Sequence, residues 1–455
     1  MQKLIWILFF WVGAVTSYAL GPHEIIVVVN GNSNESVKLA RKYAVMRSVP
    51  RMNIIRLSTP DLKAESFSIS PAEFTRMIWR PVNKIISERG LEDRVLAWVY
   101  STGFPLRVET MPHMSIQGIT FVRNSVPESR EIQKGLYRSD LFAGPDSPWE
   151  KGNMSQTFDV YRRWLGDEMP LPSMLLGYSG KRGNTAGEIT SCLKKGGASD
   201  GTAPGGTVYF VKSEDIRSRC RHWQYPAASR ELRGEGIESV LLDRFPENRK
   251  DIIGLMMGSA SVQPDSAGYF LPGAMGEHLT SAAAIFDSAG QTKLSAWIKA
   301  GATASAGTVT EPLSIWKKFP CARFFVHYAR GCTVMESFFQ SVRCPLQIVF
   351  AGDPLASPWS ANGRLVLKGL PKTADSGKFE IKAEVRESDV HFVDYEYFLD
   401  DRKTGEGSSL MLDISTMKPG ERRLRAVAYS AGLVRKQLFT EQAFTVVRKQ
   451  NGVER

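Results

Sequence analysis

The chain has 455 residues, of which 43% are hydrophobic and 23% charged. These values predict two or three folded domains and exclude a disordered chain. The formal net charge of +11 would suit nucleic acid or an anionic glycan, but the sequence has no run of five Lys or Arg residues. It also lacks a basic stretch interleaved with aromatic residues. We therefore expect the positive charge to be spread over the surface, with no specific nucleic-acid site.

Residues 1–19 have the pattern of a secretory signal peptide. Lys3 forms a short positive region, Leu4–Val15 is an apolar run, and Ser17 and Ala19 are small. The run is too short to span a bilayer comfortably, which favours cleavage after Ala19 over an uncleaved anchor helix. No later stretch is as long as a membrane span. We therefore expect an exported protein of the periplasm, cell surface or extracellular space, without a membrane span after signal removal.

Strand and helix patterns alternate through the next part of the chain. Apolar, β-branched runs predict buried strands at Ile25–Val29, Ile54–Leu57 and Val95–Tyr100. Between the first two, apolar residues recur at helical spacing. Before the third, Ser70-Pro71-Ala72-Glu73 is a capping box that begins a helix, which Pro81 should kink and Gly90 can end. This alternation predicts a doubly wound, mostly parallel α/β sheet.

Residues 108–172 lack clean periodicity and are rich in Gly, Pro and Ser, so we expect a long loop-rich excursion. The alternation then resumes, with predicted strands at Leu175–Tyr178, Thr207–Val211, Ser239–Leu242, Ile252–Met257, Ala282–Phe286, Ala302–Val309 and Leu346–Phe350. The predicted helices are Ala186–Lys195, Ala227–Arg233, Lys293–Lys299 and Phe324–Gln340. Because parallel sheets bind ligands at the carboxyl ends of their strands, we expect a site among the loops there.

From about Gly363 the hydrophobic period changes to two. Phe379–Val385 alternates strictly, and later strands are predicted at Tyr395–Leu399, Leu410–Ile414, Arg423–Tyr429 and Ala443–Val447. About ninety residues of short strands separated by turns predict an immunoglobulin-like β-sandwich over residues 363–450.

Three motifs carry a resemblance to known proteins. These are Gly-x-Pro-Leu-Arg from Gly103 to Arg107, Gly-Ala-x-Ala-x-x-Gly-x-x-x-Glu-Pro from Gly301 to Pro312, and Gly-Asp-Pro from Gly352 to Pro354. Together with the order of the elements, they resemble an uncharacterised family of exported bacterial proteins with a gingipain-like α/β domain. The resemblance implies a caspase-like fold over residues 20–360, followed by the immunoglobulin-like domain.

The same resemblance argues against cysteine-peptidase activity. In gingipain-like peptidases a His-Gly pair follows one strand and a Cys follows the next, so that the imidazole can activate the thiolate. Here Ile252–Met257 leads to Gly258-Ser259-Ala260-Ser261, which has no histidine, and Gly276–Ser281 contains no cysteine. The Cys-His dyad is missing at both positions.

His278 and Ser281 are the catalytic candidates that remain. If a helical turn joined them, their spacing would let His278 act as base to Ser281, with Glu277 or Asp353 orienting it. No nucleophile-elbow motif surrounds Ser281, which favours a packing role for both residues. Asp353 is predicted to fix the turn after its strand by accepting backbone N–H bonds. The residues expected to line a pocket are Gly103, Arg107, Gly258, Ser259, Glu311 and Asp353.

We expect no cofactor and no metal. No histidine pair has the H-x-x-x-H spacing, and no G-x-G-x-x-G or Walker motif follows the first strand. The five cysteines lack a C-x-x-C pair, and their odd number leaves at least one thiol free. Cys321 could pair with Cys332, or Cys192 with Cys220, but the sequence cannot set the connectivity.

Three functions are consistent with these patterns. The leading hypothesis is a pseudoenzyme or binding protein that takes a peptide or glycan on its loop-rich face, with Trp149, Tyr161 and Trp164 as the aromatic candidates for the contact. The second is a hydrolase that uses Ser281 and His278. The third is an adhesive or structural protein whose C-terminal domain docks to a surface protein. The sequence does not predict the oligomeric state.

Overall fold

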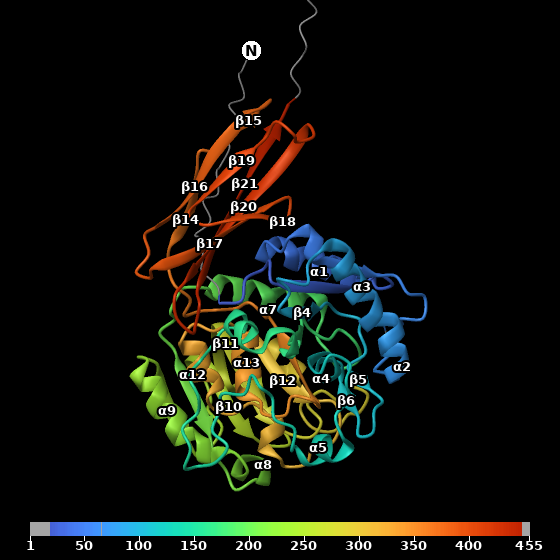
Figure 1. Ribbon diagram of the computed structural model, residues 1–455. Coiled ribbons are helices and arrows are strands. Elements are labelled where there is room, and N and C mark those ends of the chain that lie inside the picture. The colour runs from blue at the N-terminus through green and yellow to red at the C-terminus, as the bar shows by residue number, and fades with distance from the viewer. Residues whose placement is uncertain (1–18, 65, 448–455) are drawn as a thin grey trace, which may run out of the picture. The chain divides into compact units, whose positions relative to one another are not determined.

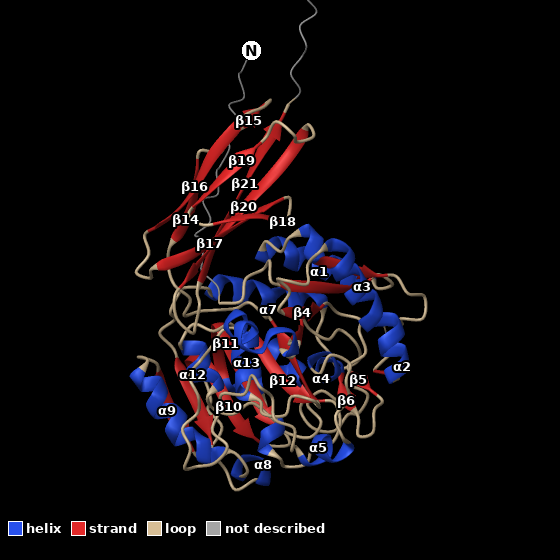
Figure 2. Cartoon of the chain, in the orientation of Figure 1, coloured by secondary structure: helices blue, strands red, loops and turns tan. Residues whose placement is uncertain are grey.

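The computed structural model describes residues 19–64 and 66–447, which form two compact units (Figure 1). One unit contains the described residues up to Ser360 together with Ala431–Lys436, and the other contains Ala361–Ser430 and residues 437–447. The first unit is mixed α/β and the second is built from strands (Figure 2). All of the predicted signal peptide except Ala19 lies outside the described residues.

A sheet of ten strands organises the α/β unit. In spatial order its strands are β2 (Ile54–Leu57), β1 (Ile25–Asn30), β4 (Ala97–Tyr100), β7 (Ser173–Leu175), β13 (Ile348–Gly352), β12 (Ala304–Thr308), β11 (Gly268–Leu279), β10 (Arg249–Gly258), β8 (Thr207–Val211) and β9 (Glu238–Leu242). Every residue of β1, β4, β8, β12 and β13 is buried. Continuous burial means that both faces of the sheet are covered, as the apolar runs predicted.

The sheet is parallel except at one place, where β12 and β13 pair antiparallel. Gly352 lies opposite Ala304, and Ile348 lies opposite Thr308. The five strands from β2 to β13 therefore run in one direction, and the five from β12 to β9 run in the other. The carboxyl ends of the two halves point to opposite edges of the sheet.

Two groups of helices lie around this sheet, and the helices within each group contact one another. The first group is α1 (Asn34–Arg47), α7 (Ala186–Ser199) and α11 (Leu294–Ala300), and the second is α9 (Tyr225–Gly234), α12 (Phe324–Ala329) and α13 (Val334–Ser341). The shorter helices are α2 (Pro71–Phe74), α3 (Arg80–Arg89), α4 (Ile116–Phe121), α5 (Ser129–Lys134), α6 (Phe158–Leu165), α8 (Ile216–Arg219) and α10 (Pro264–Ala267). Within the described part of the chain, no helix combines the length and the apolar character needed to cross a membrane.

The helix predicted from Ser70 to Gly90 begins and ends where expected. Ser70 and Glu73 form the predicted capping box, and Gly90 ends α3 in the left-handed conformation. The interior differs, because a π-helical segment at Thr75–Trp79 separates α2 from α3. It directly precedes Pro81, which has no N–H to donate and whose ring crowds the preceding turn.

Two predicted elements were wrong. Phe324–Gln340 is not one helix: α12 ends at Ala329, Gly331 takes a positive φ of 97°, and Thr333 caps a separate helix, α13. The predicted strand at Ala282–Phe286 is a series of turns, whereas Gly268–Leu279 is a long strand that the prediction missed. The strand was missed because Gly273 and Gly276 lower its β-propensity. Its second half is nevertheless fully buried.

The excursion at residues 108–172 is more ordered than its composition suggested. It contributes to a small sheet of β3 (Ser68–Ile69), β5 (Arg107–Val108) and β6 (Met114–Ser115), and it contains α4, α5 and α6. The side chain of Gln117 bonds both backbone groups of Phe350, at 2.7 and 2.9 Å. The first part of the excursion is therefore packed onto the large sheet and is not a detachable lid.

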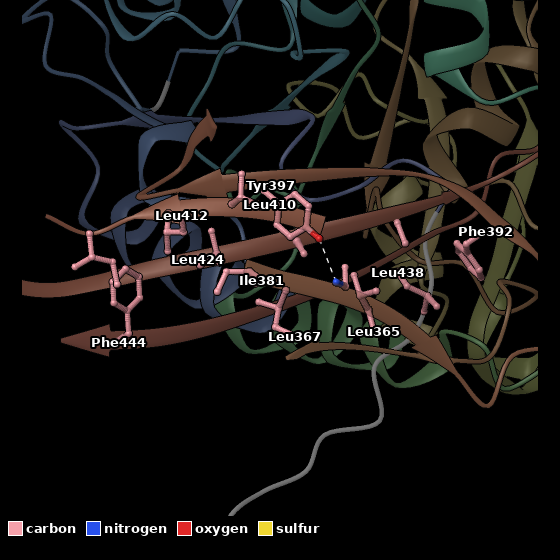
Figure 3. Close-up of a cluster of buried hydrophobic side chains, with 14 of the residues drawn as sticks. Leu365, Leu367, Ile381, Phe392, Tyr397, Leu410, Leu412, Leu424, Leu438 and Phe444 are labelled. Atoms are coloured by element: carbon pink, nitrogen blue, oxygen red, sulfur yellow. Dashed lines mark hydrogen bonds between the residues drawn. The ribbon is translucent and has the colours of Figure 1, made fainter. Parts of the chain in front are cut away.

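Two sheets packed around a common core form the second unit. One sheet contains β14 (Arg364–Lys368), β16 (Lys378–Arg386) and β19 (Ser409–Asp413). The other contains β15 (Thr373–Ala374), β21 (Gln437–Val446), β20 (Gly420–Ser430), β17 (Phe392–Leu399) and β18 (Arg402–Glu406). Figure 3 shows the core between them, where Tyr397 places its hydroxyl 3.1 Å from the amide of Ala383 on the facing sheet. Strand pairing is antiparallel except between β15 and β21.

Candidate functional site

The antiparallel junction divides the residues that were expected at one sheet edge. Gly103, Arg107 and Asp353 follow strands of the first half of the sheet. The remaining expected residues belong to the second half of the sheet. Gly258 and His278 lie on its strands, and Ser259, Ser281 and Glu311 follow them. The expectation of one shared edge was therefore wrong, since it took the strands on both sides of β12 and β13 to be parallel.

His278 and Ser281 have separate hydrogen-bond partners. His278 is fully buried on β11, where its Nδ1 accepts the Nε1–H of Trp297 at 2.9 Å. Burial, assisted by the charge of Arg221, lowers the pKa of His278 to about 3, so its imidazole is neutral and a weak base. Ser281 donates its hydroxyl to Oε1 of Glu311 at 3.1 Å. No helical turn joins the two residues, because β11 continues to Leu279.

The end of β10 is closed by the short helix α8. A Cβ atom on Gly258 would overlap the backbone of Arg217 and Ser218, so this helix lies directly on the strand end. The amide of Ser259 donates to the carbonyl of Leu279 at 3.3 Å, and its hydroxyl donates to the carbonyl of Ser261 at 2.9 Å. Gly258 and Ser259 therefore form packed structure here and not an open anion-binding turn.

A buried ion pair lies beside these strand ends. Arg221 on the segment after α8 donates to the carboxylate of Glu277 on β11 and to the carbonyl of Met257 on β10. Both side chains are at most 1% exposed. Burial raises the pKa of Glu277 while the guanidinium of Arg221 opposes the rise. The pair holds the segment after α8 against β10 and β11.

Asp353 has the structural role that the sequence predicted, and it does more. Its Oδ1 accepts the amide of Leu355 at 3.2 Å, which fixes the turn after β13. The same carboxylate binds the guanidinium of Arg47 at the end of α1, and Arg47 also binds Asp200. Burial raises the pKa of Asp200 to about 6, against the opposing charge of Arg47. Gly196 leaves room for this network, because a Cβ there would overlap Asp353.

Gly103 lies on the loop after β4, and Arg107, at the start of β5, contacts a loop of the other half of the sheet. Gly103 has a positive φ of 77°, and its carbonyl accepts the side-chain amide of Asn30. Arg107 places its guanidinium 4.8 Å from the centre of the Phe67 ring and 3.6 Å from the carboxylate of Asp287. Asp287 belongs to the loop after β11, so Arg107 joins loops from opposite strand directions.

Glu311 also has a local structural role. Besides the hydroxyl of Ser281, its Oε1 accepts the amide of Leu313 at 2.8 Å. Leu313 has a positive φ of 60°, and this bond stabilises its unusual backbone conformation. The carboxylate therefore fixes the turn that follows β12.

A pocket lies away from these residues, between the Pro145–Met154 loop, α9 and the start of α12. Its volume is about 520 Å³. Its apolar lining includes Trp149 and Met154 from the loop and Ala227 from α9, and the side chain of Trp149 is 94% exposed. An exposed tryptophan at the rim of a pocket is typical of a binding surface.

Charged residues line the same pocket. They are Glu150, Lys151, Arg230, Glu231, Arg323 and Arg330. Glu231 lies 3.3 Å from Arg323 and 3.5 Å from Arg330, and Arg330 also binds Glu235 at 2.7 Å. Nη2 of Arg323 donates to the carbonyl of Asn153 at 2.9 Å, which ties the loop to α12. The four cations and two anions give the pocket a positive balance.

Of the aromatic residues proposed for binding, Trp149 alone lines this pocket. Tyr161 is buried on α6, and its hydroxyl donates to the carbonyl of Leu141 at 3.1 Å. Trp164 is exposed at the end of the same helix but does not line the pocket. The sequence identified Trp149 by its type, whereas the arginines of α9 and α12 gave no signal because their convergence is tertiary.

The cysteines supply neither a disulfide nor a reactive thiol. All five are free, so the suggested pairs Cys321–Cys332 and Cys192–Cys220 do not form. Cys321 lines the pocket, but burial raises the pKa of its thiol to about 11, which keeps it protonated and poorly nucleophilic. Among residues 19–64 and 66–447, no three His, Cys, Asp or Glu side chains are grouped to hold a metal ion.

Comparison with known proteins gives no family assignment. No protein-family model matches the chain, and a search of curated proteins finds no significant match.

Proposed function

We propose that this chain is an exported, non-peptidase binding protein that takes a peptide in the pocket beside Trp149. The observation that carries the proposal is the pocket itself, about 520 Å³ in volume, with Trp149 and Met154 at its rim and arginines along its side. Tryptophan and methionine provide adaptable contact area, and arginine provides directed hydrogen bonds. The volume falls in the range of ligand-binding pockets in proteins.

A gingipain-like, caspase-like fold for the α/β unit and an immunoglobulin-like fold for the second unit belong to this proposal. The mostly parallel sheet and the two-sheet core are consistent with them. In such a fold the ends of β10 and β11 would carry the catalytic dyad. Here Gly258 lies under α8, and the Arg221–Glu277 pair is buried beside it. These features support a protein without peptidase activity.

The hydrolase alternative gains no support from the geometry. Ser281 donates its hydroxyl to Glu311, and Nδ1 of His278 accepts the N–H of Trp297. A base needs to lie within hydrogen-bond reach of its nucleophile. Ester or peptide hydrolysis that is lost in Ser281→Ala but retained in Ser259→Ala would restore this alternative.

Deletion of residues 108–172 is not a useful test of the adhesion alternative. The deletion would remove α4, all of whose residues are buried, and the bonds between Gln117 and Phe350. Loss of binding in that variant would report unfolding. Substitutions at the pocket rim discriminate better.

The test is selection of peptides from a displayed library by the mature chain, followed by fluorescence anisotropy with the selected peptides. We expect Trp149→Ala to weaken binding about tenfold or more, because a tryptophan that a bound ligand covers can carry much of the binding energy of an interface. Trp164→Ala is the matched control, since Trp164 is also exposed but lies outside the pocket. Equal affinities of the two variants, or enrichment of glycans and not peptides in a parallel array, would contradict the proposal.

A further inference from the structure

The acidic side chains of the pocket have partners within the protein, whereas two of its basic side chains form no ion pair in the described part of the chain. Glu231 lies within ion-pair distance of Arg323 and Arg330, and Glu150 accepts bonds from the amide of Asp146 and the hydroxyl of Ser147 within its own loop. In the described part of the chain, no ion pair is formed by the exposed side chains of Arg230 and Lys151. The anions of the pocket are thus engaged, while two of its cations are available to a ligand.

Arg230 is placed to act together with the apolar part of the pocket. It follows Ala227 by three residues on α9, so the two side chains share one face of the helix. Both residues are exposed and both line the pocket. A ligand that lies along this face would place one group against Ala227 and Trp149 and the next group beside the guanidinium of Arg230.

We infer that the pocket selects a peptide in which an acidic side chain lies next to a bulky apolar one, with Arg230 binding the carboxylate. This inference rests on the proposed function. Arginine binds carboxylates through paired N–H donors, and such charge-assisted bonds are stronger than neutral ones. Trp149 and Met154 contact the apolar side chain.

An acidic peptide fits this lining better than an acidic glycan. Sugar hydroxyls need acceptors as well as donors, and the carboxylates of Glu150 and Glu231 are already engaged. The carbonyl of Asn153 accepts from Arg323. The lining also contains apolar surface and the cationic donors of Arg230 and Lys151, which have no ion-pair partner among the described residues. These groups suit an apolar side chain followed by a carboxylate.

The test compares two pools of capped hexapeptides with the full mature chain by fluorescence anisotropy. The pools are identical, with leucine or phenylalanine at one position, except that the next position is glutamate in one pool and glutamine in the other. We expect the glutamate pool to bind about tenfold more tightly. Arg230→Gln should abolish this preference, whereas Arg233→Gln, an exposed arginine of the same helix outside the pocket, should retain it.

Three outcomes separate this inference from the proposed function. If both pools bind equally and Trp149→Ala weakens both, the pocket binds peptides but the acidic preference is overturned. A preference that Arg233→Gln removes as fully as Arg230→Gln would also overturn it, because the charge would then act diffusely. If neither pool binds, and the displayed library yields no peptide, the proposed function itself fails.

Discussion

At the scale of single residues, three ionisable groups with clearly perturbed pKa values are buried and structural. His278, Asp200 and Glu336 have shifted pKa values mainly because burial disfavours their charged forms. Perturbed groups often mark active sites, but buried networks perturb pKa values as well. None of these three residues lines the pocket beside Trp149. Their expected effects are therefore on stability and not on ligand binding.

His278 should make the protein less stable in acid. Its pKa is about 3 in the folded state and 6.5 ordinarily, so between these values the unfolded chain binds a proton that the folded protein does not. The free energy of unfolding should then decrease as the pH is lowered from about 6.5 towards 3, by up to about 1.4 kcal/mol per pH unit from this group. Above the ordinary pKa of histidine this group should not change the stability with pH. Urea unfolding at several pH values measures this slope.

The matched variant is His278→Gln, whose amide oxygen can still accept the N–H of Trp297. It should show a shallower loss of stability between about pH 6 and pH 4 than the natural chain. Identical slopes for the two proteins would contradict the assignment of this acid sensitivity to His278.

Arg47 should be among the most destabilising positions to change. Arg47→Met leaves the carboxylates of Asp200 and Asp353 buried without their partner, which we expect to cost roughly 3–5 kcal/mol in denaturant unfolding. Arg76→Met is the control, because its pair with Asp61 is exposed to solvent and should contribute little. A small effect of Arg47→Met would show that Asp200 and Asp353 take up protons instead.

At the scale of elements, local sequence predicted several of the helices and strands. Ser70 and Glu73 form the predicted capping box that begins α2. The capping box of Thr333 and Glu336, which begins α13, was not predicted. The boundary at Arg330-Gly331 was missed, because the apolar period continues across it. The helix ends there because Gly331 takes a positive φ, and a hydrophobic pattern does not predict this backbone conformation.

Gly258→Ala should separate α8 from the end of β10. The added methyl group would overlap the backbone of Arg217, and we expect a destabilisation of about 1–3 kcal/mol by thermal or urea unfolding. Gly234→Ala, at the end of α9, is the control, since a Cβ there meets nothing within 4 Å. That change should be neutral or slightly stabilising. Equal stability of the two variants would mean that α8 is not packed on Gly258.

At the scale of the whole molecule, the proposed export makes a prediction about processing. The mature chain should begin at Leu20, which N-terminal sequencing or intact mass measurement of the secreted protein would establish. Ala19 and Leu20 are buried in the folded unit, so cleavage should precede folding. Replacement of Ala19 by arginine should block processing. If the unsubstituted chain also accumulated at full length, the signal-peptide prediction would be contradicted.

The amino-acid sequence by itself determined the alternating α/β elements, the burial of the central strands and the change to a two-residue period near Gly363. These depend on side-chain polarity and on caps, which act over a few residues. Only the tertiary structure decided that β12 and β13 pair antiparallel, that α8 covers Gly258, and that Arg230 and Trp149 line one pocket. Each of these depends on segments far apart in the chain, and their packing leaves no local pattern in the sequence.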